Sequence, residues 1–296
     1  MKRLPDERGI ILVIVLWIMT LLSVMAGSFA YSMRTETRLA INRVERAQAR
    51  ALADAGVAYA MLQVLDASRQ TPGVLPWPVD GSVREWRFGS GQLRIAVVDA
   101  GGLIDLNSAD RRLLRGLLAF AGVGAEELEK RLDAIEDWRD PDDLRHPNGA
   151  EGADYRAAGR VTGPKNRPFE SVEELQQVLG ITPELYKAIA GGLTVYSDKA
   201  GVNPALAPEL VLRALPGMDA TAVAGFLQAR AESAAQGLPP VQLPESGPYL
   251  SQSKVGTYHV FVEARLDTGS EAFLEAVVVP ASGSTPYRVR ARREGR

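Results

Sequence analysis

The stretch of this sequence with most potential for chemistry is residues 136–155, EDWRDPDDLRHPNGAEGADY, which holds seven carboxylates within nineteen residues. Carboxylates this close repel one another unless water solvates them or a cation bridges them. Two prolines and Gly149 favour a loop here. Oxygen donors, a single nearby histidine and a chain without cysteine favour Ca²⁺ over Zn²⁺ or copper. The spacing is not that of an EF-hand loop, and a solvated acidic loop is the simpler alternative.

The same stretch gives little support for catalysis. Asp140 or Asp142 has the chemistry of a general acid or base, but no nucleophile or oxyanion donor accompanies them. His146 and His259 are far apart and neither has the spacing of a metal ligand. The glycines at 89–91 and 101–102 do not open a helix after a strand as a dinucleotide-binding motif requires. We therefore predict that the chain is not an enzyme.

Near its N-terminus the chain has a long apolar run, Ile10–Tyr31. It is 22 residues long, carries no charge and comes directly after Arg8-Gly9. A run of this length matches the hydrocarbon thickness of a bilayer. The apolar core of a cleaved signal peptide is shorter, so a plain signal anchor and a prepilin-like leader ending in Gly9 are the stronger interpretations. Lys2, Arg3 and Arg8 place the N-terminus on the cytoplasmic side and predict that the remainder is translocated.

The composition limits the possible partners and architectures. The chain has 296 residues, of which 46% are hydrophobic, enough for an anchor and one or two globular units. Its 34 basic and 36 acidic residues give a net charge of −2, which provides no general attraction to nucleic acid or anionic lipid. The absence of cysteine excludes disulfides and thiolate metal sites.

Helical character continues beyond the apolar run to about residue 66. One apolar stripe recurs at steps of three, four and seven residues, and we expect it to pack against one side of a sheet. We expect Thr71-Pro72-Gly73 to end the helix. The stripe consists of Ile41, Val44, Ala51, Ala55, Ala58, Leu62 and Leu65.

The remaining sequence predicts one sheet divided by a large insertion. Strands are expected over residues 83–88 and 92–98, around the turn Gly89-Ser90-Gly91, and again over 257–266, 271–279 and 287–293. Between the two groups, the chain has helical periodicity. There it predicts three helix-hairpin-helix units that bend near Gly122, Gly180 and Gly217, with Asn or Ser capping each first helix.

Helix-hairpin-helix units often grip phosphate with the backbone N–H groups of the bend. Here acidic side chains follow each bend, namely Glu126 and Glu127, then Glu184, then Asp219. They would repel a phosphate backbone, so we expect no nucleic-acid partner. A membrane-anchored helix-hairpin-helix protein that binds DNA at the cell envelope is the alternative.

Several of these features together resemble the minor pseudopilin K family of bacterial type II secretion systems. They are Arg8-Gly9 before the apolar helix, the motif DWRDPDD with the following PNGAE, and VNPALAPELVLRALPGM. The resemblance implies cleavage between Gly9 and Ile10 by the prepilin peptidase, methylation of the new terminus and a structural Ca²⁺. It also implies that the metal ligands are Asp137, Asp140, Asp142, Asp143 and Glu151. The isoleucine at Ile14, where most pseudopilins carry glutamate, fits a subunit that has no neighbour beyond it.

The resemblance further implies an α+β, pilin-like fold, with a long N-terminal helix packed on an antiparallel sheet and a large all-α insertion. Its expected parts are a leader (1–9), a transmembrane helix (10–31), the pilin helix and first strands (32–100), an inserted α-helical domain (101–245) and the C-terminal strands (246–296). A protein of this family caps the pseudopilus tip with minor pseudopilins I and J, and it helps to initiate assembly for export across the outer membrane. We expect a single-pass protein of the inner membrane with its C-terminal domain in the periplasm.

Overall fold

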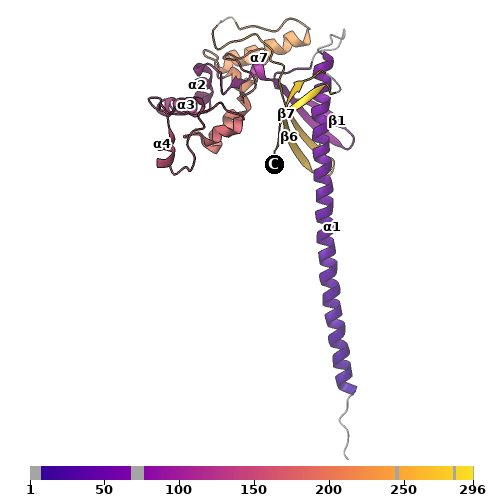
Figure 1. The fold of residues 1–296 in the computed structure, drawn as a ribbon. Helices are drawn as coiled ribbons and strands as arrows, with labels where there is room; N and C mark the ends of the chain where they lie inside the picture. The colour runs from indigo at the N-terminus through magenta and orange to yellow at the C-terminus, as the bar shows by residue number, and fades with distance from the viewer. Residues whose placement is uncertain (1–7, 68–76, 244–246, 283–284, 296) are drawn as a thin grey trace, which may run out of the picture.

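A single long helix, α1 (Arg8–Ala67), begins the part of the chain that the computed structural model describes, which is residues 8–67, 77–243, 247–282 and 285–295. At about 1.5 Å per residue its 60 residues extend about 90 Å. Figure 1 shows that only the second half of α1 runs along the sheet, while the first half projects beyond the rest of the molecule. The predicted helix is confirmed. Both its expected end at Thr71-Pro72-Gly73 and leader residues 1–7 lie outside the described residues.

Five antiparallel strands form the main sheet in the order β1-β2-β5-β6-β7. All five predicted strands are confirmed, with ends shifted by two residues at most. The glycines at 89–91 form the predicted β1–β2 turn, where Gly89 has a φ of +58°. The strands are β1 (Arg84–Phe88), β2 (Gly91–Asp99), β5 (Tyr258–Leu266), β6 (Glu271–Pro280) and β7 (Tyr287–Gly295).

The second half of α1 and one face of the sheet share a core. Alternate residues of β2, such as Leu93 and Ile95, point at the helix and are buried. Gly56 allows the two layers to approach closely, because a Cβ there would lie 2.7 Å from a Val262 methyl group and 2.8 Å from a Leu93 methyl group. The helix contributes the side chains of Ala49, Leu52, Ala53, Val57, Ala60, Met61 and Val64.

The apolar stripe predicted to face the sheet lies mostly on the opposite side of α1, so that prediction is wrong. Ile41, Val44 and Leu62 are 51%, 56% and 62% exposed. Ala51 and Ala58 are exposed, and only Leu65 packs against the helix–sheet core. The physical reason is that α1 carries two apolar faces. The sheet buries the face that combines large side chains with Gly56, which permits closer contact.

The insertion leaves and re-enters the sheet at one point, because β2 and β5 are neighbours. Asp99 at the end of β2 is fully buried and holds this junction together. Its Oδ1 accepts hydrogen bonds from the backbone N–H groups of Gly101 (2.8 Å) and Val255 (3.0 Å). Its Oδ2 accepts one from the N–H of Gly256 (3.0 Å). One carboxylate therefore ties the outgoing chain to the returning chain.

Within the insertion, three hairpins turn at glycines with positive φ, namely Gly122 (86°), Gly180 (85°) and Gly217 (77°). The first pairs two regular helices, whereas the second begins with a 3₁₀ segment and the third with a single helical turn. The elements in chain order are η1 (Ala100–Gly102), β3 (Ile104–Asp105), α2 (Arg111–Phe120), α3 (Ala125–Arg139), α4 (Gly152–Ala157), η2 (Val172–Gln177), α5 (Pro183–Ile189), η3 (Ala190–Gly192), β4 (Leu193–Thr194), α6 (Glu209–Leu212) and α7 (Ala220–Ala235).

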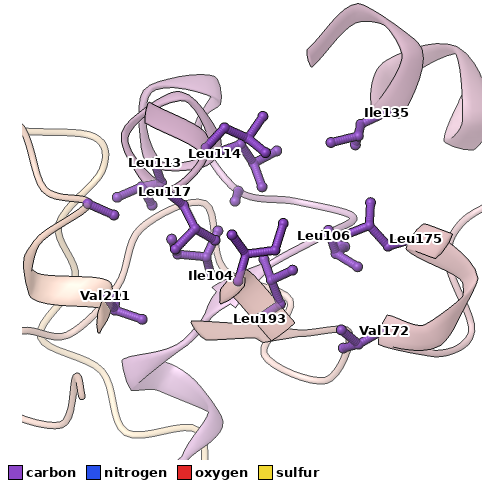
Figure 2. Close-up of a cluster of buried hydrophobic side chains, with 14 of the residues drawn as sticks. Ile104, Leu106, Leu113, Leu114, Leu117, Ile135, Val172, Leu175, Leu193 and Val211 are labelled. Carbon is purple, nitrogen blue, oxygen red and sulfur yellow. The ribbon is translucent and has the colours of Figure 1, made fainter. Parts of the chain in front are cut away.

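The predicted caps of these units are largely wrong. Asp110, not Asn107 or Ser108, caps α2 through a bond from the N–H of Arg112. The side-chain amide of Asn107 instead bonds to the backbone carbonyl and N–H of Phe169. The predicted cap is also wrong at α6, because the residue at its N-cap position is Pro208. The bonds between Asn107 and Phe169 join two segments that are far apart in sequence. Both segments surround a continuous apolar core (Figure 2), to which Ile104, Leu117 and Leu193 contribute.

Candidate metal centre

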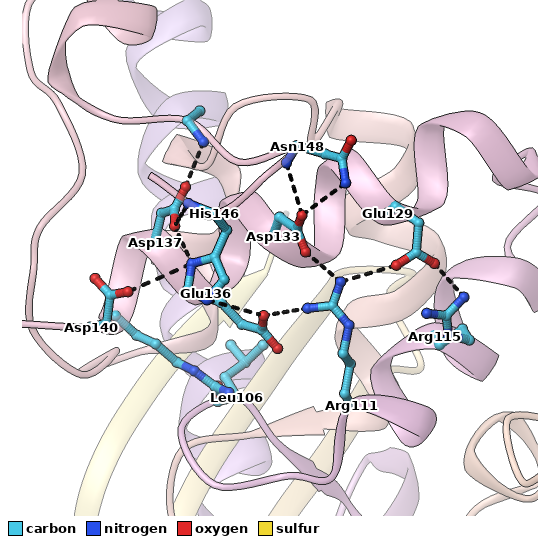
Figure 3. Close-up of polar contacts among 12 residues, drawn as sticks. Leu106, Arg111, Arg115, Glu129, Asp133, Glu136, Asp137, Asp140, His146 and Asn148 are labelled. Atoms are coloured by element: carbon cyan, nitrogen blue, oxygen red, sulfur yellow. Dashed lines mark hydrogen bonds and ion pairs between the residues drawn. The ribbon is translucent and has the colours of Figure 1, made fainter. Parts of the chain in front are cut away.

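The acidic stretch forms the end of α3, a loop and the start of α4, and Asp137 organises this loop from the buried side. Its carboxylate is fully buried and accepts hydrogen bonds from the backbone N–H groups of His146 (3.0 Å) and Ala150 (2.7 Å). The His146 ring also contacts Asp137 (Figure 3). Gly149 is needed for this closure, because a Cβ there would lie 1.8 Å from Asp137 Oδ2.

Asp140 and Glu151 bring unpartnered oxygen atoms to the same region. Asp140 is the C-cap residue of α3 and Glu151 is the N-cap residue of α4. Asp140 Oδ1 and both carboxylate oxygens of Glu151 are buried and have no hydrogen-bond partner among the described residues. The N–H of Asp154 donates to the main-chain carbonyl of Glu151 (2.8 Å), and the N–H of Glu151 donates to Asp154 Oδ2 (2.9 Å). Buried carboxylate oxygens without a donor are costly, so these atoms are available to a cation.

The electrostatics of the loop show that these carboxylates share one environment. Burial raises the pKa of Asp140, and the charges of Asp142 and Asp137 raise it further. Burial also raises the pKa of Glu151, to which Asp137, Asp140 and Asp143 add. Burial and the neighbouring carboxylates therefore disfavour the ionised forms of Asp140 and Glu151, which is the condition that a bound cation relieves.

The five predicted ligands do not all lie equally deep. Asp142 and Asp143 are on the exposed part of the loop, where one oxygen of each accepts a hydrogen bond, from the Leu144 N–H (2.8 Å) and the Asn166 side-chain amide (2.7 Å). Among the described residues, the acidic and histidine side chains that converge within 4.8 Å are those of Asp137, Asp140 and His146. His146 is not among the ligands predicted from the sequence, because its spacing matches no ligand motif.

A second polar cluster supports the loop from the other side. Arg111 of α2 forms ion pairs with Glu129, Asp133 and Glu136 on α3 (Figure 3). Asn148 of the loop donates to Asp133 Oδ2 from its backbone N–H (3.0 Å) and its side-chain amide (3.1 Å). Burial alone would raise the pKa of Asp133, but its bonds with Arg111 and Asn148 outweigh burial and lower that pKa. The cluster therefore fixes the loop to the α2–α3 hairpin.

We expect Arg111→Met to destabilise the chain by about 2 kcal/mol, because Asp133 loses its charged partner while keeping the two bonds from Asn148. The measurement is the free energy of unfolding in urea. Arg115→Met is the matched control. Its side chain is 47% exposed and pairs with Glu129, so its loss should cost less than about 1 kcal/mol. Equal effects of the two substitutions would contradict the role of Arg111.

The donor set fits Ca²⁺. Buried or half-buried carboxylate oxygens from Asp137, Asp140 and Glu151 are the hard ligands that this ion prefers. Three of these oxygens have no hydrogen-bond partner in the part of the chain that the structure describes. Loop atoms and water would complete the coordination, since Ca²⁺ takes six to eight oxygens.

The expected processing site lies at the start of α1. The helix includes Gly9 and Ile10 without a break, and the Ile10 side chain is 64% exposed. The first part of α1 is also long and apolar enough to cross a membrane. Its most apolar segment is not buried by other described residues.

The chain is similar to known proteins in both sequence and fold. A family model for type II secretion system protein K, covering its first domain, matches residues 95–198. Type II secretion system protein K of Klebsiella pneumoniae is 28% identical over 65% of this chain and 64% of its own length. A putative protein K of Escherichia coli K12 is 25% identical over 62% of this chain and 61% of its own length. The matches thus span less than two thirds of either relative.

The fold itself also has a solved counterpart. A chain in the crystal structure of the GspK-GspI-GspJ complex from the type II secretion system of enterotoxigenic E. coli aligns with a TM-score of 0.61. The alignment covers 86% of this chain and 98% of that chain at 17% identity. The predicted α+β fold and the resemblance to type II secretion system protein K are therefore confirmed. None of these relatives supports the alternative of DNA binding.

Proposed function

We propose that the chain is a minor pseudopilin that caps the pseudopilus tip of a type II secretion system and helps to initiate its assembly. The observation that carries this proposal is α1, whose apolar first half is not buried by the rest of the described chain and whose second half packs against the sheet. Such a helix serves first as a membrane anchor and then as a packing element between subunits. In this role the chain is a structural component and not an enzyme.

The partners follow from the same proposal. The structural counterpart belongs to a complex named for GspK, GspI and GspJ, so we propose that this chain joins the I and J minor pseudopilins of its own system. The prepilin peptidase would cleave between Gly9 and Ile10, and the new N-terminus would be methylated. The chain would then lie in the inner membrane with its C-terminal part in the periplasm.

We also propose that Ca²⁺ binds the α3–α4 loop as a structural ion. Asp137, Asp140 and Glu151 would supply the inner ligands, and Asp142 and Asp143 would contribute from the exposed side. When bound, the ion neutralises the mutual repulsion of these carboxylates and fixes the loop in one conformation.

Two measurements test the assembly role. Mass spectrometry of the chain purified from native membranes should find an N-terminus at a methylated Ile10. Affinity purification of the full chain should also recover the I and J subunits of the same system. An unprocessed chain that purifies alone would contradict the proposal. Salt-sensitive DNA binding in place of subunit binding would favour the envelope DNA-binding alternative.

A further inference from the structure

The segment of α1 between the apolar run and the sheet carries a local excess of positive charge. The chain as a whole has a net charge of −2, but residues 32–48 contain four arginines and two glutamates. The arginines are Arg34, Arg38, Arg43 and Arg46, and all four are exposed. Within the described ranges, no carboxylate forms an ion pair with any of them. Figure 1 shows that this part of α1 lies beyond the sheet.

Arg34 and Arg38 form a pair of like charges without a counterion among the described residues. They are four residues apart, so both side chains lie on one face of the helix, where two like charges destabilise it unless an anion lies between them. Glu36, two residues from each, points to a different side. The carboxylate of Glu45 accepts a hydrogen bond from the Ser270 hydroxyl (2.7 Å), which holds it beside the sheet. The pair is therefore open to an anion from outside the chain.

The position of this pair along α1 indicates which anion is near. The apolar run ends at Tyr31, and Arg34 and Arg38 follow it by three and seven residues. At a rise of about 1.5 Å per residue, they lie about 4.5 and 10.5 Å beyond it. When the run spans the hydrocarbon, a polar headgroup layer of about 5–7 Å adjoins its end. Helical side chains tilt toward the N-terminus, which here is toward the membrane, so both guanidinium groups reach the lipid headgroups.

Phosphate is the anion that the headgroup layer supplies. A guanidinium group binds phosphate through paired, charge-assisted hydrogen bonds. A lipid with an amine in its headgroup offers its own cation to that phosphate, whereas a lipid of net negative charge does not. Arg43 and Arg46 lie about 18 and 22 Å beyond Tyr31, which is more than a Debye length of about 8 Å outside the headgroup layer. These two arginines should therefore contribute little.

From the unpaired arginines and their position along the helix, we propose that Arg34 and Arg38 form a binding site for the phosphate of an anionic phospholipid. The site lies at the surface of the membrane on the translocated side. The inference rests on the proposed membrane anchor and adds a lipid partner to it. One lipid phosphate would lie between the two guanidinium groups and neutralise the pair. The site is local to residues 34–38 and uses neither the sheet nor the insertion.

Fluorescence quenching in vesicles measures which lipid lies beside this part of the helix. The full chain carries Trp17→Phe/Val24→Trp, so that the reporter lies about 10 Å below Tyr31, in the leaflet that contacts Arg34. The three remaining tryptophans all follow residue 76 and give a constant background. The vesicles contain phosphatidylcholine and phosphatidylglycerol, with bromine on the acyl chains of one lipid at a time. Comparing the quenching by the two lipids gives the relative binding constant of the anionic one.

We expect Arg34→Gln/Arg38→Gln to lower this relative binding constant at least about threefold, because each basic residue near a charged membrane surface contributes a factor of about five. Arg43→Gln/Arg46→Gln is the matched control. It removes the same charge from the same helix but farther from the membrane, so it should change the constant less than about 1.5-fold. Equal losses in the two variants, or a wild type without preference for phosphatidylglycerol, would overturn the inference.

The same vesicles separate this inference from the proposed function. Quenching by brominated phosphatidylcholine alone supports the membrane anchor, and its absence would contradict the anchor and the proposed function with it. Quenching without preference for the anionic lipid would contradict the lipid site alone.

Inorganic phosphate, compared with chloride at equal ionic strength, tests for a soluble anion at the same arginines. An unchanged lipid preference supports the phospholipid as the ligand. A loss of preference that only phosphate causes would show that the site takes a free anion, and would overturn the inference. Circular dichroism establishes that each variant keeps its helix content.

Discussion

Calcium is expected to raise the melting temperature of the wild-type chain and to leave that of an Asp140→Asn/Glu151→Gln variant unchanged. A ligand that binds only the folded state stabilises it by about 4 kcal/mol at a thousandfold excess over its dissociation constant. The amide variant keeps the size of both side chains but removes the charges of two carboxylates, which hold three buried oxygens without a hydrogen-bond partner among the described residues. Differential scanning calorimetry of the full chain in detergent, with calcium or with a chelator, measures the difference.

In the chelator, the wild type should lose its advantage in melting temperature over the Asp140→Asn/Glu151→Gln variant. Without the ion, burial raises the pKa values of Asp140 and Glu151, and the charges of neighbouring carboxylates raise them further. Removing two of the charges relieves both effects, so the variant should be at least as stable as the wild type. Glu184→Gln, an exposed substitution on α5, should behave like the wild type under both conditions. A wild type that is indifferent to calcium would contradict the metal site.

Gly116→Ala is expected to destabilise the chain by about 3 kcal/mol, at the upper end of the range for overpacked cores. Gly116 lies in the middle of α2, where propensity alone predicts that alanine stabilises. Here a Cβ would lie 1.9 Å from the carbonyl oxygen of Ala214 and 2.8 Å from its carbonyl carbon. Because both atoms belong to the backbone, no side-chain rotation relieves the clash, and α2 must move away from the segment after α6.

Gly225→Ala is the matched control for Gly116→Ala. Gly225 is also inside a helix, α7, but apart from the adjacent backbone of that helix no described atom lies within 4 Å of the position its Cβ would occupy. That substitution should stabilise by about 0.5–1 kcal/mol, the ordinary difference in helix propensity. Urea unfolding of both variants measures the contrast. Effects of the same sign at the two glycines would contradict the close contact between α2 and Ala214.

The strands and the long helix could be predicted from the sequence because their signals are local. Each strand alternates or is continuously apolar between turn residues, and no proline interrupts residues 10–67. The buried face of α1 could not be predicted in the same way. The helix has one apolar face that includes Leu52 and Met61 and a second that includes Val44 and Leu62. Periodicity detects a face but cannot say which of two faces meets a sheet that is distant in sequence.

The candidate metal centre was partly predictable, because only some of its signals are local in the sequence. Carboxylate density and the PNGAE motif located the loop, and the structure places Asp137, Asp140 and Glu151 at its inner side. The roles of His146 and Arg111 depend on contacts across 9 and 22 residues, to Asp137 and Asp133. No spacing rule covers such pairs. The hairpin caps were missed because Asn107 bonds to Phe169, 62 residues away.

The junction at Asp99 has a mechanical consequence for the molecule. A force applied to the helical insertion enters the sheet through β2 and β5, which are interior strands with a neighbour on each side. Because ladder hydrogen bonds run perpendicular to antiparallel strands, a pull along these strands loads whole ladders in shear at the same time. It does not peel them one bond after another, as it would at an edge strand. The insertion is therefore attached where the sheet best resists tension, and α1 carries that load onward along its length.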